Sequence, residues 1–68
     1  MSPSVKVDRE MGTVTIDRAA VLVIPDYANN IHSFLKWIQQ QSEVTPRHTS
    51  LAVTQLRNTV TDSDFWKP

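Results

Sequence analysis

The chain has no cysteine among its 68 residues, which excludes disulfide bridges and thiolate metal sites. It has only two histidines, His32 and His48, so a structural zinc site would need further ligands from carboxylates. One glycine and four prolines leave no flexible linker and no low-complexity segment. We therefore expect one small domain over residues 1–68, with no cofactor and no metal ion.

The chain also lacks an excess of charge of either sign, because seven basic residues balance seven acidic ones. A neutral chain has no overall field that would steer it to nucleic acid or to an anionic membrane. The longest apolar run, residues 19–24, is far too short to span a bilayer. The first residues, Met-Ser-Pro-Ser-Val-Lys, have no apolar stretch of the kind found in secretory signals. These features predict a cytoplasmic protein without a membrane partner.

The short length limits how large a core the chain can build. A domain of about this size buries only roughly 60% of the surface that its unfolded chain exposes, so a monomer is marginally stable. With disulfides and metal excluded, self-association is the remaining source of extra stability. We therefore predict a homodimer.

Alternating apolar and polar residues predict a β-hairpin at the start of the chain. Residues 4–8 and 13–17 each alternate with period two and are rich in valine, isoleucine and threonine, which is typical of half-buried strands. The connection over residues 9–12 ends in Gly12, which adopts positive φ without strain.

The apolar run over residues 19–24 has two interpretations. Its β-branched residues predict a strand that is buried on both faces. A helix capped by Asp17 is the alternative, but Pro25 closes the run, and the residue before a proline is pushed out of the α region. The strand is the favoured interpretation.

Two helices are predicted in the second half of the chain. Apolar residues recur at steps of three and four over residues 26–41, where Asp26 can start a helix whose apolar face includes Tyr27. A second helix is predicted over residues 46–60, with Thr45 as its cap and Pro46 in its first position. The expected fold class is α+β, with an N-terminal hairpin followed by two α-helices, of which one or both pack on the sheet; with the strand interpretation of residues 19–24, the sheet gains a third short strand.

Aromatic and apolar residues outside the predicted core stripes are candidates for contacts with a partner. Trp37 and Leu51 fall away from the apolar faces of their helices, and Phe65 and Trp66 follow the second helix. Such residues form either an interface or a wider core of the chain itself. The complete set predicted to bind a partner adds a basic rim to these anchors: Trp37, Leu51, Phe65, Trp66, Lys36, Arg47 and Arg57.

Two features suggest DNA binding as an alternative. The predicted helices and the short turn between them have the order of a helix-turn-helix, and the second helix carries Arg47 and Arg57. In addition, residues 13–17 and the run Val-Leu-Val-Ile-Pro over residues 21–25 resemble the N-terminal module of AbrB/MazE-type transition regulators and antitoxins. This resemblance covers about thirteen residues and implies a dimeric DNA-binding regulator. The chain has Ala19-Ala20 where that family has Gly-Arg.

Catalytic motifs are absent from the sequence. It contains no nucleophile elbow, no glycine-rich phosphate loop and no metal-spaced histidine pair. We therefore expect a non-catalytic regulatory protein that binds and inhibits another protein. Proteins of this size are common among the accessory factors of phages and mobile elements, so such an origin is part of the prediction. The alternative is a DNA-binding transcriptional regulator or antitoxin.

Overall fold

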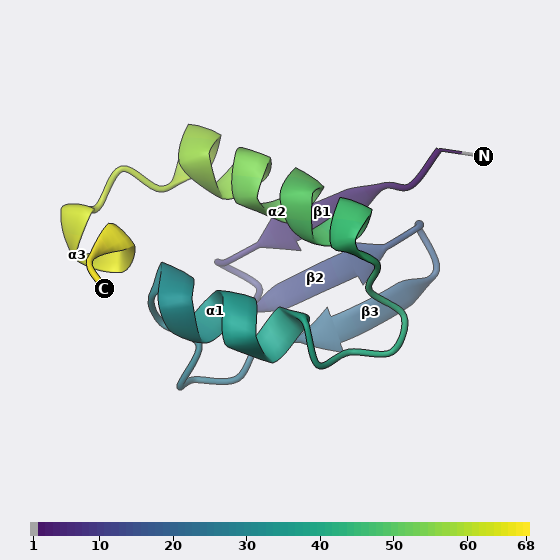
Figure 1. Ribbon diagram of the computed structural model, residues 1–68, viewed down its shortest axis with the longest axis horizontal. Coiled ribbons are helices and arrows are strands. Elements are labelled where there is room, and N and C mark those ends of the chain that lie inside the picture. The colour runs from purple at the N-terminus through teal and green to yellow at the C-terminus, as the bar shows by residue number, and fades with distance from the viewer. Residues whose placement is uncertain (1) are drawn as a thin grey trace.

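The computed structural model describes residues 2–68 and has one sheet covered on one side by helices (Figure 1). Its strands are β1 (Val5–Asp8), β2 (Thr13–Ile16) and β3 (Ala20–Val23), and its helices are α1 (Ile31–Ile38), α2 (Pro46–Thr59) and α3 (Ser63–Trp66). The sheet is antiparallel, in the order β1-β2-β3. The predicted α+β class is therefore confirmed, including its third strand.

The predicted hairpin is confirmed in both strands and in its turn. Val7 of β1 pairs with Val14 of β2, and Gly12 has a φ of 71°, in the left-handed region that glycine adopts without strain. A second tight turn joins β2 to β3 through Asp17 and Arg18, whose φ angles are 52° and 60°. Two consecutive positive φ angles are typical of type I′ turns, which match the twist of antiparallel strands.

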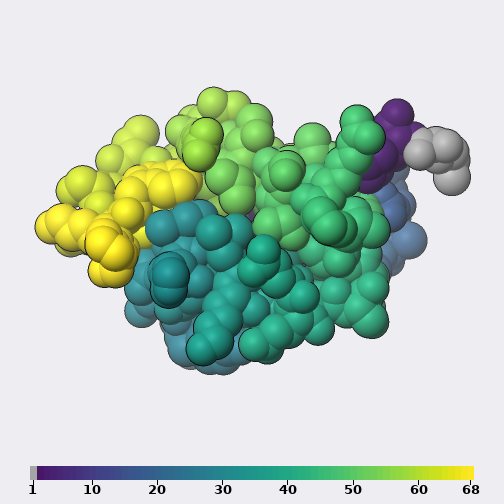
Figure 2. Space-filling model, viewed as in Figure 1, coloured from purple at the N-terminus to yellow at the C-terminus, as the bar shows by residue number. Residues whose placement is uncertain are grey.

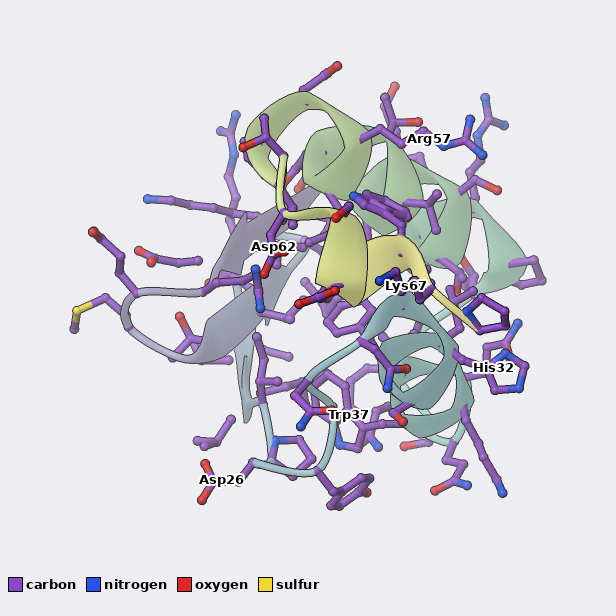
Figure 3. All side chains as sticks on the ribbon, turned by 90° about the vertical axis from the view of Figure 1, so that its left-hand side faces the viewer. Asp26, His32, Trp37, Arg57, Asp62 and Lys67 are labelled. Carbon is purple, nitrogen blue, oxygen red and sulfur yellow. The ribbon has the colours of Figure 1, made fainter. Side chains whose placement is uncertain are left out.

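Residues 20–23 form a strand, but the prediction that this strand is buried on both faces is wrong. Val21 is 62% exposed and Val23 is 76% exposed. The sheet has helices on only one side, as the side view shows (Figure 3). In the direction of Figure 1, helix and loop atoms hide most of the strands (Figure 2). The outward side chains of β3 therefore remain in solvent although they are apolar.

The first helix begins five residues later than predicted, at Ile31 rather than Asp26. Asn30 is its N-cap, with an extended backbone and a side chain that accepts a hydrogen bond from the amide of Ser33 at 2.9 Å. After Pro25 the chain makes a turn in which the amide of Ala28 donates to the Pro25 carbonyl. Tyr27 thus lies outside the helix and is 62% exposed, because asparagine favours caps over helix interiors.

Helix α2 agrees with its predicted bounds to within one residue, and its N-terminus has the predicted cap. The side chain of Thr45 accepts a hydrogen bond from the amide of His48, and the His48 ring accepts one from the amide of Thr45. This reciprocal pair is a capping box in which histidine replaces the usual glutamate. The two main helices run in opposite directions across the sheet (Figure 1).

The core lies between the sheet and the helices, and it includes two residues that were predicted to contact a partner. Trp37 is only 7% exposed and its ring centroid lies 5.7 Å from that of Phe34, so the prediction that it lies off the core face is wrong. Helix α3 contacts α1 and widens the core in this direction. The buried apolar residues are Val14, Ile16, Ala28, Phe34, Trp37, Ile38, Ala52, Leu56, Val60 and Phe65.

The aromatic tail folds back onto the chain. Phe65 is 2% exposed and the guanidinium of Arg9 lies 4.6 Å from the centre of its ring. Trp66 is half-buried, and its Nε1 donates to the carbonyl of Val60 at 2.9 Å. Of the two interpretations of this tail, the wider core is the one that the structure supports.

Candidate interaction surface

The outer face of the sheet changes from charged to apolar as it crosses the three strands. The register places Lys6, Thr15 and Val21 in one cross-strand row, and Asp8, Thr13 and Val23 in the next. Successive side chains of a strand alternate between faces, so both rows lie on the face opposite the core residues Val14 and Ile16. The apolar end of each row is the exposed β3.

Two further apolar side chains flank the C-terminal end of β3. Met11 is 75% exposed in the β1–β2 turn, which lies beside this end because the amide of Ile24 donates to the Gly12 carbonyl. Tyr27, 62% exposed, follows in the turn after β3. We call Met11, Val21, Val23 and Tyr27 the β3 face; they are the exposed large hydrophobic residues of the described chain. Single exposed apolar residues are ordinary, whereas a contiguous apolar patch is a candidate interaction site; Val21 and Val23 lie on the same face of one strand.

The two edges of the sheet differ in how their backbone groups are satisfied. At β1, the side chain of Gln55 accepts a hydrogen bond from the amide of Val7 at 2.9 Å and donates one to the carbonyl of Val5. The amide of Gln55 thus replaces the peptide group of a neighbouring strand, and α2 covers this edge. The side chain of one glutamine therefore closes the β1 edge.

The edge of β3 is open. The Ile24 amide bonds to the Gly12 carbonyl at 2.8 Å, and bonded pairs alternate along an antiparallel ladder. Leu22 is therefore bonded to Val14, whereas the backbone groups of Val21 and Val23 point away from β2. Within residues 2–68 these outward groups have no hydrogen-bond partner. Such an edge is a template for another strand.

A polar cluster at the other end of the sheet holds the β2–β3 turn against α2. His48 is 3% exposed; its Nδ1 accepts from the amide of Thr45 at 3.0 Å, so its Nε2 carries the proton and donates to Asp17 Oδ1 at 2.9 Å. The amide of Ser4 donates to the same oxygen at 3.0 Å. The hydrogen bonds from His48 and from Ser4 hold the pKa of Asp17 below its ordinary value of 3.8.

An open cleft of about 710 Å³ adjoins this cluster and is lined by Arg18 and Arg47, among others. Both ring nitrogens of His48 are engaged: Nδ1 lies 3.0 Å from the amide nitrogen and 2.8 Å from the hydroxyl oxygen of Thr45, and Nε2 lies 2.9 Å from Asp17 Oδ1. Within residues 2–68, no three His, Asp or Glu side chains converge on a possible metal position. The hydrogen bonds of His48 tie the β2–β3 turn to the N-terminus of α2.

The residues predicted to bind a partner do not form one surface. Their placement is as follows: Trp37 and Phe65 are buried, Leu51 and Trp66 are half-buried, and Lys36, Arg47 and Arg57 are exposed. Lys36 belongs to α1, and Arg47 and Arg57 belong to α2, so all three lie on the helical side of the molecule, away from the β3 face. Figure 3 shows Arg57 on α2 and Trp37 among the side chains beneath it. Their partner-binding role stays a prediction.

The β3 face cannot be recognised from the sequence pattern, for a specific reason. Val21 and Val23 belong to a run that is apolar at every position, so alternation could not separate the buried from the exposed side chains. Tyr27 was assigned to the apolar face of a helix that starts only at Ile31. The available signal was the register, because Thr13 and Thr15 stand beside these valines on a polar face.

No family model, curated protein or solved structure matches this chain. The resemblance to AbrB/MazE-type regulators thus stays a prediction. Among residues 2–68, no helix has the length and apolar character required to cross a membrane.

Proposed function

We propose that this chain is a non-catalytic cytoplasmic regulator that binds another protein through the β3 face and inhibits it by covering part of its surface. The observation that carries the proposal is the gathering of the exposed large hydrophobic side chains around one strand. Their polar neighbours Thr13 and Thr15 lie between them and the charged end of the face. An apolar centre with a polar rim is the usual composition of a protein–protein interface.

Burial of these side chains in a complex contributes favourably to binding. Complete burial of one valine contributes roughly 1.5–3 kcal/mol, and both valines of the β3 face are more than half exposed. Tyr27 adds an aromatic ring with a hydroxyl group, which is a residue type enriched at binding hot spots. The absence of cysteine suits a protein of a reducing compartment.

A photo-crosslinking experiment tests the proposal. A photoreactive amino acid is placed at Val23 or, as a control on the same face, at Lys6, and crosslinked proteins are identified from the source cells. We expect one protein other than the chain itself to be captured from position 23 and not from position 6. The captured protein is then purified, and its affinity for the chain is measured directly.

The decisive variant is Val21→Thr/Val23→Thr, which keeps the shape and strand preference of both side chains but removes apolar surface. We expect the affinity to fall at least ~10-fold, with an unchanged unfolding temperature, whereas Lys36→Ala/Arg57→Ala leaves it unaltered. Equal binding by both variants contradicts the proposal. Loss of binding only in Arg47→Ala/Arg57→Ala, with a steep salt dependence, would instead support the nucleic-acid alternative.

A further inference from the structure

We propose that the open edge of β3 pairs with β3 of a second copy of this chain, antiparallel, across a two-fold axis that passes beside Leu22. This inference is separate from the proposed function, because it uses the backbone of the edge, whereas partner binding uses the side chains of the outer face. Extending a sheet at its edge leaves that face open.

The outward backbone groups of β3 fit this arrangement. With Leu22 next to the axis, Val21 of each copy stands opposite Val23 of the other. These are the residues whose amides and carbonyls point away from β2. Each Val21–Val23 pair can exchange both of its hydrogen bonds, as bonded pairs in antiparallel sheets do. The two Leu22 side chains, which are partly buried against the core, then meet on the helical side.

The outer face becomes symmetric in the same register. The row of Lys6, Thr15 and Val21 continues into Val23, Thr13 and Asp8 of the second copy. The valines of both copies are then adjacent at the centre, with threonines beyond them. The charges at the two ends of each row have opposite sign. Cross-strand contacts between β-branched side chains contribute to the stability of such a sheet.

Charge complementarity at the strand ends argues for a second copy as the occupant. Arg18 lies in the turn before β3 and Asp26 in the turn after it, so antiparallel pairing of two β3 strands brings the end of one copy that carries Arg18 toward the end of the other that carries Asp26, and the two-fold axis generates this approach twice. Both side chains are exposed, and neither has a salt-bridge partner within residues 2–68. Opposite charges placed in this way favour the correct register and disfavour others.

Closure of the other edge limits the assembly to two copies. The side chain of Gln55 bonds to the Val7 amide and the Val5 carbonyl and α2 packs against β1, so a third chain finds no second open edge. A two-fold contact uses the same patch on both copies, so that neither copy has that patch free to bind a third chain. The contact between two four-residue strands is small, and we therefore expect a dimer that dissociates on dilution.

Sedimentation across a concentration series tests the dimer, and charge substitutions test its register. We expect wild type to change from monomer to dimer. Arg18→Glu and Asp26→Arg should each raise the dissociation constant at least ~10-fold, because each places like charges together. The double variant Arg18→Glu/Asp26→Arg should restore the wild-type value, and Arg57→Glu on α2 should not change it.

A cysteine crosslink gives a second test that does not depend on these charges. The chain has no cysteine of its own, so Leu22→Cys should form a covalent dimer on mild oxidation, since residues of an unbonded antiparallel pair approach to about 4.5 Å. Lys6→Cys at the opposite edge should not. A wild-type chain that remains monomeric at millimolar concentration, or equal crosslinking at both positions, overturns this proposal. Neither result affects partner binding by the β3 face, which the valine-to-threonine variant tests.

Discussion

Asp17 has both a left-handed backbone conformation and side-chain hydrogen bonds to two other segments of the chain. Its φ of 52° is in the left-handed region, which aspartate tolerates better than most residues. Its Oδ1 atom accepts hydrogen bonds from the His48 ring and from the Ser4 amide. One carboxylate thereby joins the β2–β3 turn, the N-terminal segment and the start of α2. The turn geometry of Arg18, the next residue and a proposed dimer contact, depends on this arrangement.

The lowered pKa of Asp17 predicts a specific dependence of stability on pH. Since this pKa is below 3.8 in the folded chain, the ionised carboxylate stabilises the fold above that value. The contribution disappears as the pH falls through the folded-state pKa. Asp17→Asn keeps an acceptor oxygen but removes the charge, so it should lower the urea midpoint at pH 7 and match wild type in acid. Glu10→Gln, an exposed turn variant, serves as control; a constant difference at every pH contradicts the prediction.

At the scale of elements, helix α1 shows how a local cap overrides a longer apolar pattern. Its amphipathic period can be extended back to Asp26, but Asn30 caps the helix four residues later. The segment between Pro25 and Asn30 makes a turn instead and buries Ala28. This turn leaves Tyr27 in solvent beside β3, where a helix starting at Asp26 would have placed it on the core face.

Asn30→Ala should therefore destabilise the protein by about 1 kcal/mol, the usual cost of removing an N-cap side chain. Its neighbour Asn29 is exposed, and Asn29→Ala should change the free energy of unfolding by less than ~0.5 kcal/mol. Denaturant unfolding of both variants measures the difference. Equal effects would mean that the helix does not begin at Ile31.

At the scale of the whole molecule, the sheet is asymmetric in both its faces and its edges. Helices cover one face, and the side chain of Gln55 closes one edge. The open face and the open edge meet at β3, so the most exposed apolar side chains lie beside unpaired backbone groups. Under the two proposals, a partner would contact the side chains of β3 and a second copy would contact its backbone groups.

Opening the second edge should change the size of the assembly. Gln55→Leu leaves the Val7 amide and the Val5 carbonyl without their partner, which costs about 1 kcal/mol. With two open edges, sheets can continue from chain to chain, and light scattering should detect species larger than a dimer. Thr54→Leu, which adds the same side chain on the exposed side of α2, should form no species larger than a dimer. Larger species in both variants would mean that the added leucine side chain, and not the open edge, causes the association.

Local patterns were sufficient for much of the fold. Alternation in β1 and β2, the positive φ of Gly12, and the Thr45-Pro46 start of α2 all depend on near neighbours in sequence, and all are present in the structure. The start of α1 was missed because two caps, Asp26 and Asn30, were compatible with one apolar period. The choice between them depends on the turn after Pro25.

The candidate surface could not be found in this way, because exposure of an apolar side chain is a property of what packs against it. The sequence by itself determined the α+β class, the neutral charge and the lack of disulfides. Only the tertiary structure decided that Trp37 and Phe65 enter the core while Val21 and Val23 remain outside. The physical reason is that the helices cover only one face of the sheet. A strand valine is therefore buried if it lies on the covered face, as Val14 does, and exposed if it lies on the other face, as Val21 and Val23 do.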